Sequence, residues 1–411
     1  MKKLSIFLLT MGLAVSLSSC KFVENLVNGN NQNNTNNNTN TNTPTTVITG
    51  SVDTNTTPTT IIPTTTIESS IEPSDSTTIP SITTTGDIST STDEIEKKDI
   101  YYAKNYLSTK GDKYVNLYNA IFNGLNSVYL SNKTITDTKN VNVTYTNPDN
   151  TTTTKTETYY VAAQIEFYKQ YNVESDAAYA ILKCVVLDHP EFYFVNSLST
   201  VSSTKIGDKL DSQTLNVFCS DEYYEGDTRA LYNQKLNEYK TNIDNLITNP
   251  SSDKHIIRTV HDYIINNGAY AFEADGVTPS TKNQAHNLMG LVIDKKGVCE
   301  SYSELFKYLL NQYNIPSIIV SGTGINSAGS GGHAWNYVNI DNKYYGFDLT
   351  WDDPVSNSGD KLEYDYFAKG KNSDFLSSHV PSITDDFSQK LNFLYALPEL
   401  ATLSKLLVEF V

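Results

Sequence analysis

The stretch KKGVCESYSELFKYLLNQYNIP, residues 295–316, decides the fold of this chain. An amphipathic helical pattern begins at Cys299, which is one of only four cysteines in 411 residues. Tyr302, Leu305 and Leu309 recur at helical spacing, so this helix should pack one face on a core and carry Cys299 in its first turn. A helix N-terminus favours the thiolate form of a cysteine, which is the nucleophilic form. A lone cysteine is more often a small buried apolar residue, so a reactive role needs support from elsewhere in the chain.

That support comes from the stretch GGHAWNYVNIDNKYYGFDLTWDDP, residues 331–354. Two alternating segments flank Asp341-Asn342, a pair typical of two-residue hairpin turns. In the register that this turn sets, Asp348 lies diagonally across from His333 on the same face, within reach of an imidazole–carboxylate hydrogen bond. The sequence therefore offers a nucleophile, a base and a carboxylate that could orient the base.

The motifs GVCESYSELFKYLL, GGHAWNYV and YYGFDLTWDDP, in this order, resemble the transglutaminase-like superfamily. The resemblance covers Asp253 to Pro354, with VHDYIINNGAY similar to the leading helix, and it includes both tryptophans, Trp335 and Trp351. It implies an α+β fold with a papain-like core, in which the helix bearing the nucleophile packs on an antiparallel sheet that carries the histidine and aspartate. Relatives often have glycine where Ser301 stands, and serine is small enough to be tolerated.

The resemblance implies a catalytic triad of Cys299, His333 and Asp348 that forms a thioacyl intermediate with a peptide or protein substrate. If water resolves this intermediate, the chain is a cysteine peptidase or amidase; if a lysine amine does, it is a protein-glutamine acyltransferase. Two other readings stay open. The same fold could serve as a non-catalytic module that binds a peptide or glycan, or function could lie in the N-terminal region, as in an adhesin or spacer.

Other side chains are weaker candidates for the site. We expect Trp335 and Tyr302 to line the substrate groove. His286 could reach the groove and donate to an oxyanion, but a partly exposed loop histidine is the simpler role. His379 could lie at the rim. The motifs of zinc and calcium sites are absent from the sequence, so we expect neither a metal nor a cofactor.

Three further features have simple structural interpretations. His261 and Asp262 are adjacent on a helix, where neighbours point to different faces, so they should not form a dyad. Asp352, Asp353 and Asp360 should form a solvated acidic turn. The Gly- and Ser-rich segment Gly322 to Gly332 should be a mobile connection, or else a mobile rim that gates the groove.

The first residues, MKKLSIFLLTMGLAVSLSSC, predict a signal peptide over residues 1–19. Small residues before Cys20 resemble the lipobox of bacterial lipoproteins, in which this cysteine is lipidated. We therefore expect a lipid anchor that holds the protein on the extracytoplasmic face of the cell membrane.

Residues 20–98 are dominated by Asn, Thr, Ser and Pro and should form a disordered tether, because this composition cannot bury a core. The net charge of −16 argues against binding nucleic acid. We expect a monomer whose partners are its substrate and, through the lipid, the membrane.

The remaining chain divides into an N-terminal α+β region, residues 99–249, and a transglutaminase-like domain, residues 250–411 with its core at 253–354. Apolar periodicity and turn residues predict helices at 112–130, 174–189, 227–247 and 252–267, a hairpin within 141–164 and a strand at 214–220. Cys184 and Cys219 lie among large apolar residues, which favours two separate buried thiols over a disulfide.

Overall fold

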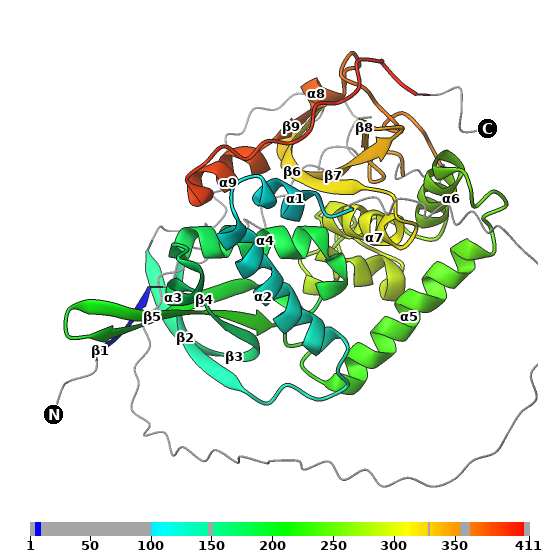
Figure 1. Ribbon diagram of the computed structural model, residues 1–411. Coiled ribbons are helices and arrows are strands. Elements are labelled where there is room, and N and C mark those ends of the chain that lie inside the picture. Colours follow the sequence, from blue (N-terminus) through cyan, green and yellow to red (C-terminus); the bar gives the residue numbers. More distant parts are fainter. Residues whose placement is uncertain (1–4, 10–99, 147–150, 328, 354–361, 407–411) are drawn as a thin grey trace, which may run out of the picture. The chain divides into compact units, whose positions relative to one another are not determined.

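The computed structural model of the chain describes residues 5–9, 100–146, 151–327, 329–353 and 362–406 (Figure 1). The predicted lipidation residue Cys20 and the predicted tether up to residue 98 lie outside the described residues. Within the predicted signal peptide, the structure describes one short strand, β1 (Ser5–Leu9). Residues 98–411 belong to one compact unit, and the predicted boundary at residue 250 runs inside it.

The N-terminal part of the described chain is built on an antiparallel sheet with the strand order β1-β4-β5-β3-β2. Helix α2 packs against β3 and α4, and α1 packs against both of these helices. The elements are α1 (Tyr102–Ser108), α2 (Asp112–Tyr129), β2 (Thr138–Thr146), β3 (Thr152–Glu166), α3 (Tyr168–Tyr171), α4 (Ser175–Asp188), the 3₁₀ helix η3 (Pro190–Phe192), β4 (Val195–Ile206) and β5 (Lys209–Cys219). The predicted helices, hairpin and strand of this part are all present.

The C-terminal part contains an antiparallel sheet with the order β8-β7-β6-β9. Its elements are α5 (Gly226–Asp244), α6 (Asp253–Asn266), η4 (Asn283–His286), the π-helix η5 (Gly290–Asp294), α7 (Cys299–Gln312), β6 (Ser317–Asn326), β7 (Gly329–Ile340), β8 (Lys343–Phe347), α8 (Phe375–Ser378), β9 (His379–Pro381) and α9 (Ile383–Leu391). Helix α6 is capped as predicted, since the Ser252 hydroxyl accepts a hydrogen bond from the backbone N–H of His255 at 3.2 Å.

Helix α7 packs on β6 and β7, which confirms the expected arrangement of a helix that begins at a cysteine and lies against an antiparallel sheet (Figure 1). Its apolar face, including Tyr302, Leu305 and Leu309, is buried as the spacing predicts. The Asn336 side chain of β7 donates to the backbone oxygen of Ser303 at 3.0 Å. This bond fixes the strand that carries His333 against the first turn of the helix that carries Cys299.

The hairpin between β7 and β8 has the predicted turn. Asp341 and Asn342 have φ angles of 53° and 62°, as a type I′ turn requires, and Ile340 pairs with Lys343. The ladder ends at Phe347, so Asp348 directly follows the strand.

The segment from Gly322 to Gly332, which we expected to be a connection, is mostly strand. Residues 322–326 and 329–332 of this segment form the paired ends of β6 and β7, and Gly322 lies opposite His333. Glycine is needed at this position because a Cβ atom there would lie 2.1 Å from the backbone oxygen of Val380 in β9. Glycine has a low strand propensity, so the sequence pattern did not indicate a strand here. In the fold, glycine is required because a neighbouring backbone approaches closely.

A buried cation joins the two parts of the chain. Lys307, near the middle of α7, is fully buried. Its ammonium donates to the backbone oxygens of Ser317 at 2.8 Å and Ile100 at 3.4 Å, and to the side-chain oxygen of Asn311 at 3.1 Å. A buried charge is tolerated only when such partners replace water.

Cys184 in α4 and Cys219 at the end of β5 are separate, buried, free thiols, as predicted. Burial raises the pKa of both thiols, so neither favours the reactive thiolate form. In the part of the chain that the structure describes, no helix is both long and apolar enough to cross a membrane.

Candidate active site

Cys299 is the first residue of α7 and follows Val298, which has extended backbone angles. Gly297 precedes them because a Cβ atom at this position would lie 2.4 Å from the side chain of Ser301. The Ser301 hydroxyl accepts a hydrogen bond from the backbone N–H of Leu291 at 3.3 Å, so serine fits where relatives often have glycine. The Cys299 side chain therefore lies at the positive end of the helix dipole, in a tightly packed turn.

The thiol donates a hydrogen bond to Oε2 of Glu300 at 3.1 Å, and Cys299 is only 1% exposed. Nδ1 of His286 lies 3.6 Å from the same carboxylate oxygen. Burial would raise the pKa of Glu300, but His286 and the thiol outweigh it and hold the pKa below its ordinary value. The structure thus places His286 near the nucleophile through Glu300, which the sequence did not single out.

His286 is held in place by its other ring nitrogen, Nε2, which donates to the backbone oxygen of Ser280 at 2.8 Å. A carbonyl oxygen can only accept, so Nε2 carries a proton. Nδ1 is consequently the nitrogen that faces Glu300.

His333 and Asp348 form the hydrogen bond that the hairpin register predicts, with 2.6 Å between Nε2 and Oδ2. A carboxylate only accepts, so His333 donates from Nε2 and its basic lone pair is on Nδ1. The other oxygen of Asp348 accepts the backbone N–H groups of Thr350 at 3.0 Å and Trp351 at 3.2 Å. Both carboxylate oxygens are therefore fixed, and the plane of the imidazole is fixed with them.

A third side chain, His379, completes this cluster, where the sequence suggested only a position at the rim. Its Nε2 lies 2.9 Å from the same Oδ2 of Asp348, and the residue is fully buried at the start of β9. Burial lowers the pKa of His379 and outweighs the opposing effect of Asp348, so the ring is neutral at pH 7. Its Nδ1 then accepts from the Ser378 hydroxyl at 2.8 Å.

The two imidazoles determine the charge of Asp348. Burial alone would raise the pKa of this carboxyl group, but hydrogen bonds and attraction from His333 and His379 outweigh burial and hold the pKa well below its ordinary value. Asp348 is therefore an anion in the folded protein at any pH near neutrality.

Aromatic rings cover both histidines. The indole of Trp351 stacks on His333 with ring centres 5.0 Å apart and planes at 21°. Phe375 stacks on His379 at 4.1 Å and 3°. Such rings exclude water and strengthen the hydrogen bonds beneath them.

Nitrogen and oxygen atoms of His333, Asp348 and His379 lie within 4.8 Å of one another, and among the described residues this is the group that could hold a metal ion. Both histidines already direct an N–H at Asp348. The hydrogen bonds account for the positions of all three side chains.

Trp335 and Tyr302, which we expected to line the substrate groove, are both buried at 1% exposure. Tyr302 donates its hydroxyl to Oδ2 of Asp353 at 2.5 Å. Trp335 lies edge-on to His379, with ring centres 5.0 Å apart and planes at 78°. Both side chains thus support the neighbours of the site from within the core.

The prediction of a solvated acidic turn is wrong at Asp352 and Asp353, because both residues are buried, and Asp360 lies outside the described residues. Asp352 accepts from Nε2 of His261 at 3.2 Å and from the backbone N–H of Tyr366 at 2.7 Å. His261 also contacts its neighbour Asp262, with 2.9 Å between Nδ1 and Oδ1. These adjacent helix residues therefore do meet, contrary to the expectation from the sequence. This second cluster joins α6 to the segment after β8.

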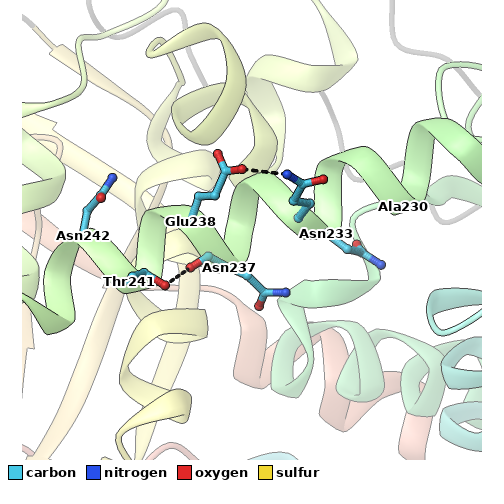
Figure 2. A pocket seen from close by; sticks show the side chains of 7 residues that line it. Ala230, Asn233, Asn237, Glu238, Thr241 and Asn242 are labelled. Carbon is cyan, nitrogen blue, oxygen red and sulfur yellow. Dashed lines mark hydrogen bonds between the residues drawn. The ribbon is translucent and has the colours of Figure 1, made fainter.

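An open polar hollow of about 530 Å³ lies along the exposed side of α5 (Figure 2). Figure 2 shows that the labelled side chains come from this one helix. Glu238 accepts a hydrogen bond from the side chain of Gln234 at 2.8 Å. It contains neither a nucleophile nor a histidine and does not include Cys299, so we assign it no part in the site.

Comparison with known proteins gives one family match. Residues 240–349, from within α5 to just past β8, match the family model of the Transglutaminase-like superfamily. This range contains Cys299, His333 and Asp348. None of the curated proteins compared with the chain matches it.

Several solved structures are distantly similar. A crystal structure of a TGase shares 15% identity over 39% of this chain and 46% of its own, with a TM-score of 0.26. The periplasmic domain of TgpA from Pseudomonas aeruginosa, bound to ethylmercury, shares 14% identity over 38% of this chain and 72% of its own, with a TM-score of 0.22. A provisionally assigned cysteine protease from Cytophaga hutchinsonii shares 14% identity over 37% of this chain and 57% of its own, with a TM-score of 0.22. The chain spans about half the length of the TGase it matches.

Proposed function

We propose that this chain, which carries a transglutaminase-like domain at residues 240–349, is a cysteine acyl-transfer enzyme that acts on amide bonds of a peptide or protein. Cys299 is the nucleophile, His333 the base and Asp348 the group that orients the base. The observation that carries the proposal is the 2.6 Å hydrogen bond between Nε2 of His333 and Asp348, because it leaves Nδ1 as the basic atom on a strand packed against the cysteine helix.

In the proposed reaction Nδ1 of His333 takes the thiol proton and the sulfur attacks the amide carbonyl. The negative charge on the carbonyl oxygen is stabilised by the backbone N–H of Cys299, at the positive end of the dipole of α7. The imidazolium then returns its proton to the leaving nitrogen, the C–N bond breaks, and a thioester remains. Water or a second amine resolves the thioester, and of these two we favour water.

The buried thiol and its bond to Glu300 support one alternative, a non-catalytic module that binds a peptide or glycan. In an enzyme the thiol must leave Glu300 and turn towards His333 before it reacts. In a binding module it would stay where it is.

An electrophilic peptide probe separates the two functions. The enzyme requires labelling at Cys299 that is lost in Cys299→Ala and in His333→Ala but kept in Cys184→Ala, a change of another buried thiol. Labelling that is equal in wild type and His333→Ala would contradict a base-activated nucleophile. A peptide library analysed by mass spectrometry would then distinguish cleaved products from cross-linked ones.

We also propose that the protein is a monomer held on the extracytoplasmic face of the membrane by lipid on Cys20. Metabolic labelling with an alkyne fatty acid should mark the wild-type chain and not Cys20→Ala. Incorporation that survives this substitution would disprove the anchor.

A further inference from the structure

A cavity of about 190 Å³ lies between the N-terminal region and the transglutaminase-like domain. One wall comes from α4 and β4, and the other from η4 and the first turns of α7. Glu300 lines this cavity, and its Oε2 atom is the one that accepts the thiol of Cys299. A group bound in the cavity would therefore lie one carboxylate away from the reacting sulfur.

Two carboxylates face the cavity from α7. Glu300 and Glu304 are four residues apart, so they lie one above the other on the same helix face. Oε2 of Glu304 accepts the backbone N–H of Leu288 at 3.1 Å. Burial raises the pKa of Glu304 to about 8, so this acid holds its proton at neutral pH unless a cation joins it.

The opposite wall carries a cation and a hydroxyl group. Burial lowers the pKa of Lys183, and among the described residues no acceptor lies within hydrogen-bond or ion-pair distance of its ammonium. Ser199 is 3% exposed, and its hydroxyl likewise has no hydrogen-bond partner within the described residues. Both groups belong to the cavity wall.

The cavity thus holds, among its described residues, a basic and two acidic side chains that attract one another without a direct ion pair. Charges removed from water are costly unless each has a partner, and direct contact between the lysine and a glutamate would be the simplest solution. The structure instead holds them on separate elements of the cavity lining, which also includes the apolar side chains of Leu182 and Phe192. A ligand that carries one charge of each sign would satisfy both walls at once.

We propose that this cavity binds the zwitterion of an α-amino acid, with its ammonium at Glu300 and Glu304, its carboxylate at Lys183 and Ser199, and its side chain against Leu182 and Phe192. This inference rests on the proposed acyl transfer and names its amine component. In hydrolysis that component is the C-terminal residue of a peptide; in transfer it is a free amino acid that accepts the acyl group.

The chemical step balances without a further reactant. The peptide C–N bond breaks as the S–C bond forms, and the proton that His333 took from the thiol goes to the leaving nitrogen. The amine formed then takes a second proton from solvent and becomes the ammonium that the two glutamates bind. The carboxylate at Lys183 is already free in the substrate, since it is the chain terminus.

Equilibrium binding tests the cavity without turnover, in the full chain carrying Cys299→Ala. The probes are L-norleucine, 1-aminopentane and hexanoate, which share an aliphatic stem. Norleucine carries both charges, 1-aminopentane carries only the ammonium, and hexanoate carries only the carboxylate. We expect norleucine to bind at least about tenfold more tightly than either single-charge probe, because each charged hydrogen bond is worth about that factor. Failure of norleucine to bind, or binding no tighter than that of the other two, would overturn the proposal.

Two variants assign the charges. Lys183→Met should weaken norleucine and hexanoate and spare 1-aminopentane, whereas Glu304→Gln should weaken norleucine and 1-aminopentane and spare hexanoate. A general loss of folding would weaken all three probes in both variants, so the opposite patterns separate recognition from damage. Lys235→Met and Glu238→Gln, an exposed pair 2.8 Å apart on α5, are the matched controls and should bind like the parent.

The outcome of these binding experiments can be separated from the outcome of the tests for acyl transfer. Norleucine binding with the expected pattern, in a wild-type chain that shows no acyl transfer, would refute the enzyme and keep the cavity. Peptide cleavage that proceeds equally well when the C-terminal carboxylate is amidated would keep the enzyme and refute the role of the cavity.

Discussion

Oδ2 of Asp348 accepts a hydrogen bond from Nε2 of His379 at 2.9 Å while the same oxygen accepts one from His333 at 2.6 Å. A carboxylate oxygen shared by two imidazole donors cannot rotate without losing both. His379 contacts the orienting aspartate rather than the nucleophile, so it is a positioning residue. It limits the freedom of His333 through Asp348.

Replacing His379 tests that role. His379→Phe keeps an aromatic ring against Phe375 but removes the N–H group, and we expect kcat to fall by about tenfold, since loss of one charge-assisted hydrogen bond costs roughly that factor. KM should change little, because His379 is fully buried. His379→Gln restores an N–H donor and should recover part of the rate; equal rates for the Phe and Gln variants would point to a packing role alone.

Cys299→Ala should abolish labelling by the electrophilic probe and lower any turnover by about a thousandfold or more, as expected when a covalent nucleophile is removed. The thermal midpoint should stay close to that of the wild type, because alanine fills nearly the same space at the start of α7. Full turnover in this variant would exclude the proposed triad.

Asp348→Asn should lower kcat by roughly 10³ to 10⁴-fold, the range for loss of the group that sets the histidine tautomer. The backbone N–H groups of Thr350 and Trp351 keep the amide oxygen on their side, so the amide N–H₂ would face two imidazole donors. Asp352→Asn is the control: it breaks the buried contact with His261 and should lower the free energy of unfolding by about 1–3 kcal/mol with little effect on kcat. The reverse pattern would show that the wrong aspartate has been assigned.

Glu304 gives stability an unusual dependence on pH. Its folded pKa of about 8 lies above the ordinary value for glutamate, so the folded state binds the proton more tightly than the unfolded state does. Stability from this group is full below the ordinary pKa of about 4.3 and is lost as pH rises to about 8.

Glu304→Gln mimics the protonated acid and should remove this loss. Relative to the wild type, its free energy of unfolding in urea should rise by about 1–2 kcal/mol between pH 5 and pH 8, the range for a partly exposed group. Glu238→Gln, on the exposed side of α5, should show no such rise. A difference that is constant across this pH range would mean that Glu304 is ionised in the fold.

Gly322→Ala should destabilise the fold by about 1–3 kcal/mol, since its Cβ would meet the backbone oxygen of Val380 at 2.1 Å and a packed strand must shift. The shift would displace β9 and with it His379. Ser321→Ala, one residue earlier, should have little effect on thermal unfolding. A melting temperature equal to that of the wild type would show that β9 does not lie this close to β6.

Local sequence patterns predicted the parts of the site that are close in the chain. The periodicity after Cys299 gave α7, and Asp341-Asn342 set the register that brings Asp348 to His333, because a two-residue turn fixes every pair beyond it. His379 lies 31 residues beyond Asp348, after a short helix, and no local pattern connects the two. Its position depends on the pairing of β9 with β6, which only the tertiary fold determines.

Residue composition led to wrong predictions at positions where tertiary contacts determine the local structure. The glycines of β6 suggested a flexible segment, but Gly322 is present for the close approach of β9. Asp352 and Asp353 suggested a surface turn, but their partners His261 and Tyr302 come from helices far away in the chain. Glu300 is adjacent to Cys299 in the sequence, and only the structure shows that its carboxylate receives the thiol.

Lys307 limits how far this protein can be truncated from its N-terminal side. The ammonium of this buried lysine, in the same helix that begins at Cys299, bonds to the backbone oxygen of Ile100, some two hundred residues earlier in the chain. A fragment trimmed to residues 240–349 would leave that ammonium short of one acceptor inside its own core. The segment after residue 250 therefore depends on the segment before it, and a fragment meant to fold alone should include Ile100.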